Sequence, residues 1–179
     1  MARIKVLDKE FETSIPESEI LKAIDAVAEK INKELDGKNP LFVCVLNGAF
    51  MFAADLMKRI SIPCQISFVK VASYSGTSTT GSVKQLIGFN EKVEGRTVVL
   101  IEDIVDTGIT IDGLVKQVQS MGAADVRIAT MLFKPESCRP DIKPAYIGMN
   151  IPNAFIIGYG LDYDGYARNL KDIYTLVKE

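Results

Sequence analysis

The chain has 179 residues, of which 47% are hydrophobic and 25% are charged, and its formal net charge at pH 7 is −2. A slightly acidic chain lacks the basic field that recruits nucleic acid, and its apolar runs are far shorter than the roughly 20 residues of a membrane helix. The length is typical of one domain, so residues 1–179 are expected to form a single domain with a substantial core.

The chain contains no histidine. This excludes Ser-His and Cys-His catalysis and histidine-ligated zinc. Protons must be transferred by a carboxylate, Lys, Tyr, Cys or water, and a metal must be held mainly by oxygen atoms, which favours magnesium. The three cysteines, Cys44, Cys64 and Cys138, show no C-x-x-C spacing and follow no secretory signal. We therefore expect reduced thiols in a cytoplasmic protein.

The first part of the chain predicts a strand–loop–helix unit. Residues 1–13 are expected to form an extended edge. Ser14 and Glu17 stand at capping-box spacing around Pro16 and predict the start of a long helix, which residues 36–40 end. The apolar run Leu41–Leu46 then predicts a strand buried on both faces. A loop at Asn47 and Gly48 and a helix over 49–59 follow it.

The next segments predict two strands joined by a polar connection. Gln65–Ala72 has the alternation of a strand, with Ile66 and Phe68 as its apolar positions. Residues 73–82 are small and polar without apolar periodicity, which predicts a mobile loop. This loop is either a plain hairpin connection or a lid that excludes water from a site. Residues 83–89 are expected to return as the second strand.

The stretch 98–113 carries the strongest functional signal. Val98–Ile101 predicts a buried strand, and the adjacent Glu102 and Asp103 are expected in an acidic loop at its end. Asp106-Thr107-Gly108 then opens a predicted helix. In open α/β sheets, ligands bind at this edge, outside the carboxyl ends of the strands.

The residue types at this edge suit a phosphorylated ribose. The turn from Asp106 to Thr110 offers backbone N–H groups, two hydroxyls and a helix N-terminus, all of which suit a phosphate. The carboxylates of Glu102 and Asp103 can accept hydrogen bonds from vicinal hydroxyls. The alternative is a helix cap at Asp106 beside a solvated acidic pair.

The last third predicts two further strands. The first is Val126–Phe133, which places Lys134 at the same edge as the acidic pair, and a loop over 136–145 follows. Residues 154–159 predict a last apolar strand, with Asp162 shortly after its end. These elements alternate between strand and helix, as in an α/β fold.

Several of these segments resemble those of the type I phosphoribosyltransferases. Residues 101–108 with Thr110 resemble the phosphoribosyl-pyrophosphate signature, 46–49 the pyrophosphate loop and 73–76 the start of the mobile active-site loop. Residues 134–135 and 155–163 resemble the purine-recognition segments. The match spans nearly the whole chain and is most similar to the hypoxanthine and hypoxanthine-guanine phosphoribosyltransferase family.

The resemblance implies a fold and a reaction. The fold is a single α/β domain with a mainly parallel twisted sheet flanked by helices, a small hood region and a flexible active-site loop. The reaction transfers the 5-phosphoribosyl group of phosphoribosyl pyrophosphate to N9 of hypoxanthine, and of guanine, giving IMP or GMP and pyrophosphate. Mg²⁺ is the implied cofactor, and a homodimer or homotetramer is expected, without nucleic-acid or membrane partners.

The resemblance also implies site residues, with Asp106 as the general base or acid at purine N7. A cis peptide bond is implied before Gly48. The ribose and 5-phosphate would be held by Glu102, Asp103, Asp106, Thr107, Gly108 and Thr110, and the purine by Lys134, Phe155, Ile156 and Asp162. The pyrophosphate would be held by Asn47, Gly48, Arg168, Ser73 and Tyr74. The metal would be held by Glu102, Asp103 and Asp162.

Two other functions stay open. One is a phosphoribosyltransferase with a pyrimidine or 6-aminopurine acceptor, although Lys134 argues against adenine, whose 6-position is a donor. The other is an RNA-binding regulator built on the same fold, which would need a basic face. The family often carries Arg soon after its purine-contacting Lys, whereas here Arg139 is the first Arg after Lys134. The sequence leaves open which residue does that work, and which oxopurine is preferred.

Overall fold

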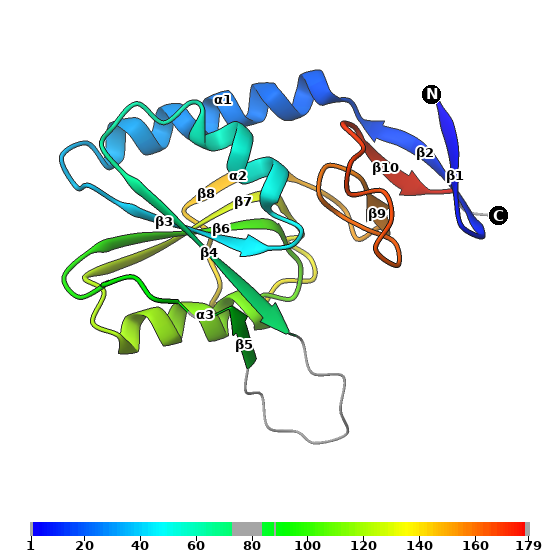
Figure 1. Cartoon of the computed structure of the whole chain (residues 1–179). Coiled ribbons are helices and arrows are strands. Elements are labelled where there is room, and N and C mark those ends of the chain that lie inside the picture. The colour runs from blue at the N-terminus through cyan, green and yellow to red at the C-terminus, as the bar shows by residue number, and fades with distance from the viewer. Residues whose placement is uncertain (1, 73–83, 88, 178–179) are drawn as a thin grey trace.

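The computed structural model describes residues 2–72, 84–87 and 89–177, which form two sheets and three helices in that part of the chain (Figure 1). The larger sheet has the order β5-β4-β3-β6-β7-β8. Its strands β4, β3, β6, β7 and β8 run parallel, and β5 joins the edge antiparallel to β4. The strands are β3 (Leu41–Leu46), β4 (Gln65–Ala72), β5 (Lys84–Ile87), β6 (Thr97–Val105), β7 (Asp125–Phe133) and β8 (Tyr146–Asn150).

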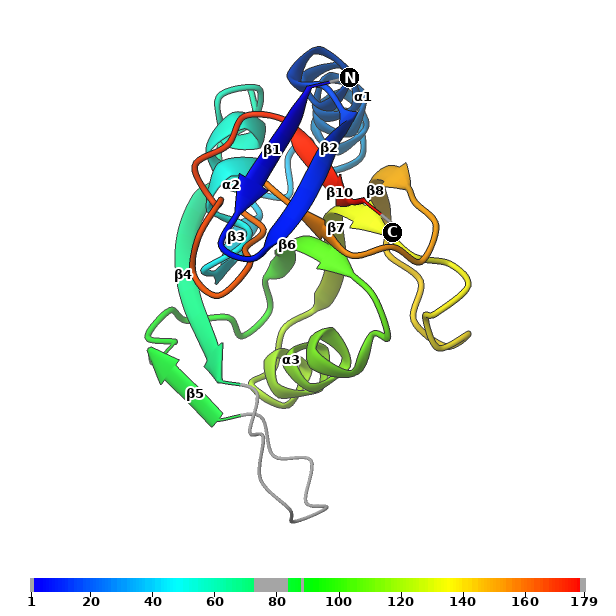
Figure 2. The ribbon, with the colours of Figure 1, turned by 90° about the vertical axis from the view of Figure 1, so that its right-hand side faces the viewer.

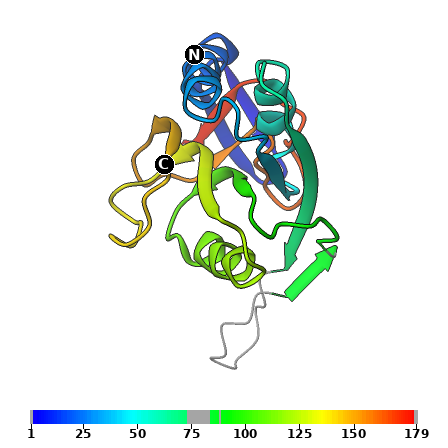
Figure 3. The same cartoon turned by 90° about the vertical axis from the view of Figure 1, so that its left-hand side faces the viewer.

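Helices cover both faces of this sheet. Helices α1 (Glu17–Glu34) and α2 (Phe50–Met57) lie on one face and α3 (Ile109–Ser120) on the other, as the side view in Figure 3 shows. Strand β3 serves both cores, because Phe42 and Cys44 pack under α1 and α2 while Val43 packs under α3. This is why its sequence is apolar without alternation. None of the described helices is long and apolar enough to cross a membrane.

A smaller sheet forms the expected hood and joins the two ends of the chain (Figures 1 and 2). Its order is β1-β2-β10-β9, and it has its own core, which includes Phe11, Ile157 and Tyr174. The hood lies beyond the carboxyl ends of the parallel strands (Figure 1). Its strands are β1 (Arg3–Val6), β2 (Lys9–Ile15), β9 (Ile156–Ile157) and β10 (Ile173–Leu176).

The capping box predicted at Ser14 was wrong. Ser14 belongs to β2, which pairs with β10, so its hydroxyl donates to the carbonyl of Ile173 at 3.1 Å. Helix α1 begins at Glu17, and the Glu17 N–H donates to Asp172 Oδ1 at 2.7 Å. The first N–H group of α1 therefore donates to a carboxylate distant in sequence, and not to the expected local side chain of Ser14.

The strand pattern near the C-terminus also differs from the prediction. Strand β8 was not predicted, since Gly148 stands in its middle. A Cβ there would press on the Met131 carbonyl oxygen of β7, so the close approach of the two strands needs a glycine. The strand predicted over 154–159 is only β9, two residues long, and it belongs to the hood. Gly158 and Gly160, with φ of +92° and +96°, end it.

Candidate active site

Glu102 and Asp103 lie inside strand β6 and not in a loop after it. The strand continues to Val105, because Glu102 pairs with Thr130 and Val105 with Phe133 of β7. The expected acidic loop was therefore wrong. Charged residues are rarely buried in a parallel sheet, which is why the pattern suggested an end at Ile101.

The two carboxyl groups are costly to hold in this position. Glu102 is only 7% exposed, and burial together with the neighbouring Asp103 charge raises its pKa well above the usual range. Burial also raises the pKa of Asp103, although a 2.7 Å hydrogen bond from the Ile104 N–H and the charge of Arg168 oppose the shift. Adjacent carboxylates retained at this cost indicate a functional site.

This cost predicts that Glu102→Gln stabilises the fold. A raised carboxyl pKa means that stability increases as pH falls through that pKa and is lowest where the group is ionised. At pH 7.5 the neutral amide should raise the unfolding midpoint by about 2–4 °C per kcal/mol relieved. Calorimetric melts at pH 7.5 and pH 5 check this, and the gain should shrink at pH 5. The exposed Glu29→Gln is the matched control; a Glu102→Gln midpoint at or below that of the control would contradict the prediction.

The loop after β3 lies directly against Asp103. A Cβ on Gly48 would overlap Asp103 Oδ2, so this close approach needs a glycine. On its other side the Gly48 carbonyl oxygen contacts Gly160 of the hood, where a Cβ would overlap it. The cis peptide bond lies between Leu46 and Asn47, one bond earlier than the resemblance implied.

Arg168 and Asp162 complete this side of the site. Arg168 donates to the carbonyl of Gly160 at 2.8 Å and forms a 2.7 Å ion pair with Asp162 Oδ1. The other oxygen of Asp162 accepts the Gly165 N–H at 2.7 Å. Asp162 and Arg168 also act on the pKa of Asp103, in opposite directions. The structure therefore places Gly48 against the Asp103 side chain, while the charges of Asp162 and Arg168 act on the pKa of Asp103.

Lys134 directly follows β7 and is buried, whereas most lysine side chains are exposed to solvent. It is 6% exposed, and its Nζ donates to Asp106 Oδ2 at 2.9 Å and to Asn153 Oδ1 at 3.3 Å. Its own N–H donates to the carbonyl of Val105 at 3.0 Å, which fixes its backbone to the end of β6. Sequence reasoning missed Asn153, and only its place two residues before Phe155 hinted at it.

The turn after β6 has the form of a phosphate cradle. Gly108, with φ of +82°, precedes the first turn of α3, which contains Thr110, and Thr107 Oγ1 accepts the Ile109 N–H at 3.4 Å. The first N–H groups of a helix lack intrahelical partners and attract anions. Arg139 packs against this turn: its N–H donates to the Thr107 carbonyl at 3.2 Å.

Two further points concern Arg139 and the hood aromatics. The Arg139 side chain pairs with Asp112 and Asp141 and does not contact Lys134 in the described structure. Phe155 is 46% exposed, and its ring meets Phe11 at 6.0 Å and Tyr163 at 5.7 Å between centroids. Ile156 follows in β9, partly exposed. Ser73 and Tyr74 lie outside the described residues.

Magnesium fits the donors at Asp103. Among the described residues, no group of three or more His, Cys, Asp or Glu side chains could hold a metal. Magnesium does not need such a group, because it keeps several waters and binds through one or two carboxylates together with substrate phosphates. Asp103 and Asp162 offer carboxylates of this kind, and the oxygens of Asp162 pair with Arg168 and the Gly165 N–H in this structure.

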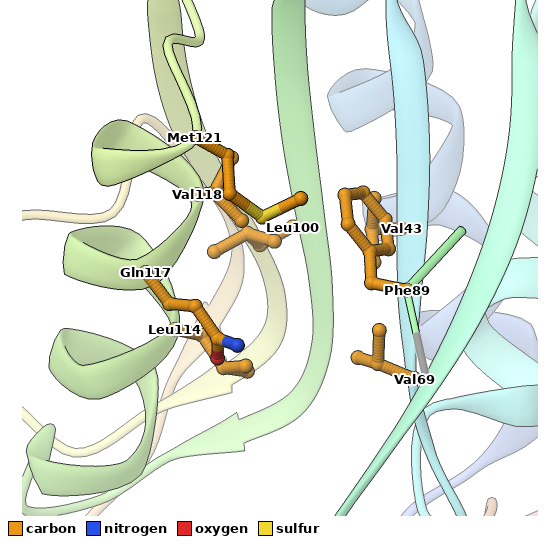
Figure 4. Close-up of a pocket in the computed structure, with 8 residues that line it drawn as sticks. All are labelled: Val43, Val69, Phe89, Leu100, Leu114, Gln117, Val118 and Met121. Atoms are coloured by element: carbon orange, nitrogen blue, oxygen red, sulfur yellow. The ribbon is translucent and has the colours of Figure 1, made fainter. Parts of the chain in front are cut away.

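A small apolar pocket elsewhere is a packing gap and not a ligand site. It lies under α3, where Leu114 and Val118 face Val43 and Leu100 of the sheet (Figure 4). Its volume is about 10 Å³, which is room for one water. It therefore belongs to the core on the α3 face.

Comparison with known proteins shows the family to which the chain belongs. The phosphoribosyl transferase domain family matches residues 15–164. The hypoxanthine-guanine phosphoribosyltransferase of Lactococcus lactis is 40% identical over 177 residues, covering 98% of this chain and 96% of that protein. Its counterpart in Streptococcus thermophilus is 41% identical over 164 residues, or 91% of each chain. A solved hypoxanthine phosphoribosyltransferase from Staphylococcus aureus has a TM-score of 0.88 and 36% identity, covering 93% of this chain and 91% of its own.

Proposed function

The chain belongs to the phosphoribosyl transferase family, and from that membership we propose how its residues act. It is an enzyme of purine salvage that transfers the 5-phosphoribosyl group of phosphoribosyl pyrophosphate to N9 of hypoxanthine or guanine, giving IMP or GMP and pyrophosphate. One observation supports the site most strongly. The ion pair of the buried Lys134 with the partly exposed Asp106 and the adjacent carboxylates of β6, of which Glu102 is buried, lie at one edge of the sheet. All 179 residues act as a single domain in this proposal.

The donor occupies the β6 side of the site in this proposal. Glu102 and Asp103 accept hydrogen bonds from the ribose hydroxyls, and Asp106, Thr107, Gly108 and Thr110 hold the 5-phosphate at the start of α3. As the bond to pyrophosphate breaks, positive charge develops at the anomeric carbon, as in glycoside chemistry. The nearby carboxylates favour that charge. The pyrophosphate is held by Asn47, Gly48 and Arg168, with Ser73 and Tyr74 over it.

Magnesium is the proposed cofactor. Asp103, Asp162 and Glu102 are the residues that would hold it. When bound with the donor, it neutralises the charge that the leaving pyrophosphate gains. The protein's own part is to orient these carboxylates: Gly48 packs on one side of Asp103, and Arg168 fixes Asp162.

The acceptor lies between Lys134 and Phe155. An oxopurine presents an oxygen at position 6 beside N7, which matches a donor beside a proton-transfer group. Lys134 donates to the 6-oxo group and Asp106 exchanges the proton at N7, while Phe155 stacks on the ring. The backbone near Ile156 and Asp162 reads position 2. Adenine would instead point an amino donor at Lys134, which can only donate.

We propose a homo-oligomer that associates through the outer face of β4. Ile66 and Phe68 lie on one face of this strand and are 38% and 46% exposed, while Val69 on the other face is buried. The two apolar side chains of this strand face are thus exposed, and clustered exposed apolar side chains mark association surfaces. Phe68→Lys should therefore lower the sedimentation coefficient to the monomer value. The control Leu7→Lys, which replaces another exposed apolar residue with a charged one, should not change the sedimentation coefficient. Equal sedimentation of wild type and Phe68→Lys would contradict this interface.

The reaction is tested by product analysis. With phosphoribosyl pyrophosphate, hypoxanthine and MgCl₂, the protein should release IMP and pyrophosphate in equal amounts, and EDTA should stop both. Failure to form either product would overturn the proposal. A gel shift with RNA distinguishes this enzyme from the alternative function, an RNA-binding regulator. A regulator should bind RNA and form no nucleotide. The cysteines Cys44, Cys64 and Cys138 are free thiols, which supports a location in the reducing cytoplasm.

A further inference from the structure

We propose that Asn153 is a positioning residue that holds the Lys134 ammonium for the 6-oxo group of the acceptor. This inference rests on the proposed function and extends it to a residue outside the family segments recognised in the sequence. Asn153 Oδ1 lies 3.3 Å from Lys134 Nζ, on the ammonium that Asp106 Oδ2 also contacts at 2.9 Å.

The number of donors on Lys134 supports this role. An ammonium has three N–H groups and no acceptor. Asp106 and Asn153 each accept one, which leaves one N–H for a ligand. With two of its three donors fixed, the third has a defined direction. Without these partners, the flexible side chain of Lys134 could adopt several rotamers, and its third N–H group would have no fixed direction.

The need for a second partner arises during the reaction. Before the acceptor binds, the Asp106 carboxylate balances the charge of Lys134. When Asp106 turns to the proton at N7, its hold on Lys134 weakens. The Asn153 side chain takes no part in that proton transfer, so its acceptor oxygen keeps a hydrogen bond to the ammonium throughout.

The place of Asn153 in the fold suits this task. It lies in the segment between β8 and β9 that links the main sheet to the hood. One end of the segment is fixed where the Ile151 N–H donates to the Phe133 carbonyl at 2.8 Å. The other end is fixed by the ring contacts of Phe155. Asn153 therefore connects the lysine of the sheet to the strand that carries the stacking aromatic.

Steady-state kinetics of Asn153 variants test the inference. Asn153→Ala should raise the KM for hypoxanthine about tenfold, the size expected for one lost hydrogen bond to a charged group. The KM for phosphoribosyl pyrophosphate should stay unchanged, and the preference for hypoxanthine over adenine should narrow. Asn153→Asp keeps an acceptor oxygen and should restore the hypoxanthine KM to within about twofold of wild type.

Asn150→Ala is the matched control, because Asn150 is exposed at the end of β8, three positions away. The inference fails if Asn153→Ala matches this control. It also fails if the Ala and Asp variants lose hypoxanthine binding equally, since the loss would then reflect side-chain packing. If wild type transfers phosphoribosyl groups to no oxopurine, the proposed function itself falls and this inference with it. A normal wild type with an unaffected Asn153→Ala variant overturns the inference alone.

Discussion

Asp106→Asn should lower kcat for IMP formation by about 10²–10⁴-fold, the usual contribution of a general acid or base. The amide has the size of the carboxylate and can still accept the hydrogen bond from Lys134, so the turn should keep its shape. It cannot take up a proton at N7. Affinity for phosphoribosyl pyrophosphate should therefore change little, because the 5-phosphate is held mainly by the backbone of the turn.

Single-turnover rates and donor binding by calorimetry separate these effects. Asp141→Asn is the control, because Asp141 is exposed and pairs with Arg139 beside the same turn. It removes a nearby carboxylate without touching Lys134. Wild-type turnover in Asp106→Asn would reduce Asp106 to a structural residue of the turn.

Lys134→Met should lower kcat/KM for hypoxanthine and guanine by about 10²-fold or more. Met has a similar length but no donor, so the 6-oxo group loses its partner, and a site built for one hydrogen bond discriminates strongly. The variant also leaves Asp106 without its 2.9 Å ion pair. Donor binding should be nearly intact, and the preference for oxopurines over adenine should narrow.

The measurement is kcat/KM for hypoxanthine, guanine and adenine in wild type and variant. Lys143→Met is the control, because Lys143 is exposed in the loop before β8. If Lys134→Met still refuses adenine as strictly as wild type does, the acceptor is selected elsewhere. The purine would then not lie between Lys134 and Phe155.

Local patterns predicted the parts of the fold that local forces decide. The apolar run of β3 has the observed bounds, Leu41–Leu46, and so does the β4 pattern at Gln65–Ala72. The predictions were wrong where a distant partner decides. Ser14 pairs in the hood and does not cap α1, and Glu102 stays in β6 because β7 continues beside it. No local signal carries such pairing.

The candidate site follows the same division. The motif around Asp106 and the residue Lys134 are visible in the sequence, and parallel strands bring their ends to one edge. Asn153 is a neutral residue in an irregular segment, and its contact depends on how the hood packs against the main sheet. Phe68 lies on the same face of the sheet as Phe42 and Cys44, which pack under α1 and α2, and it is still 46% exposed; strand alternation does not show how far a helix extends over an edge strand.

Five nucleobases offered one at a time with phosphoribosyl pyrophosphate and magnesium test the central claim most directly. Nucleotide formed from hypoxanthine, guanine, xanthine, adenine and uracil is quantified under identical conditions. Hypoxanthine and guanine should be converted at least about 10²-fold faster than adenine and uracil, because only a 6-oxopurine pairs with both Lys134 and Asp106. Equal or faster conversion of adenine or uracil, or no nucleotide from any base, would contradict an oxopurine site at the edge of β6 and β7.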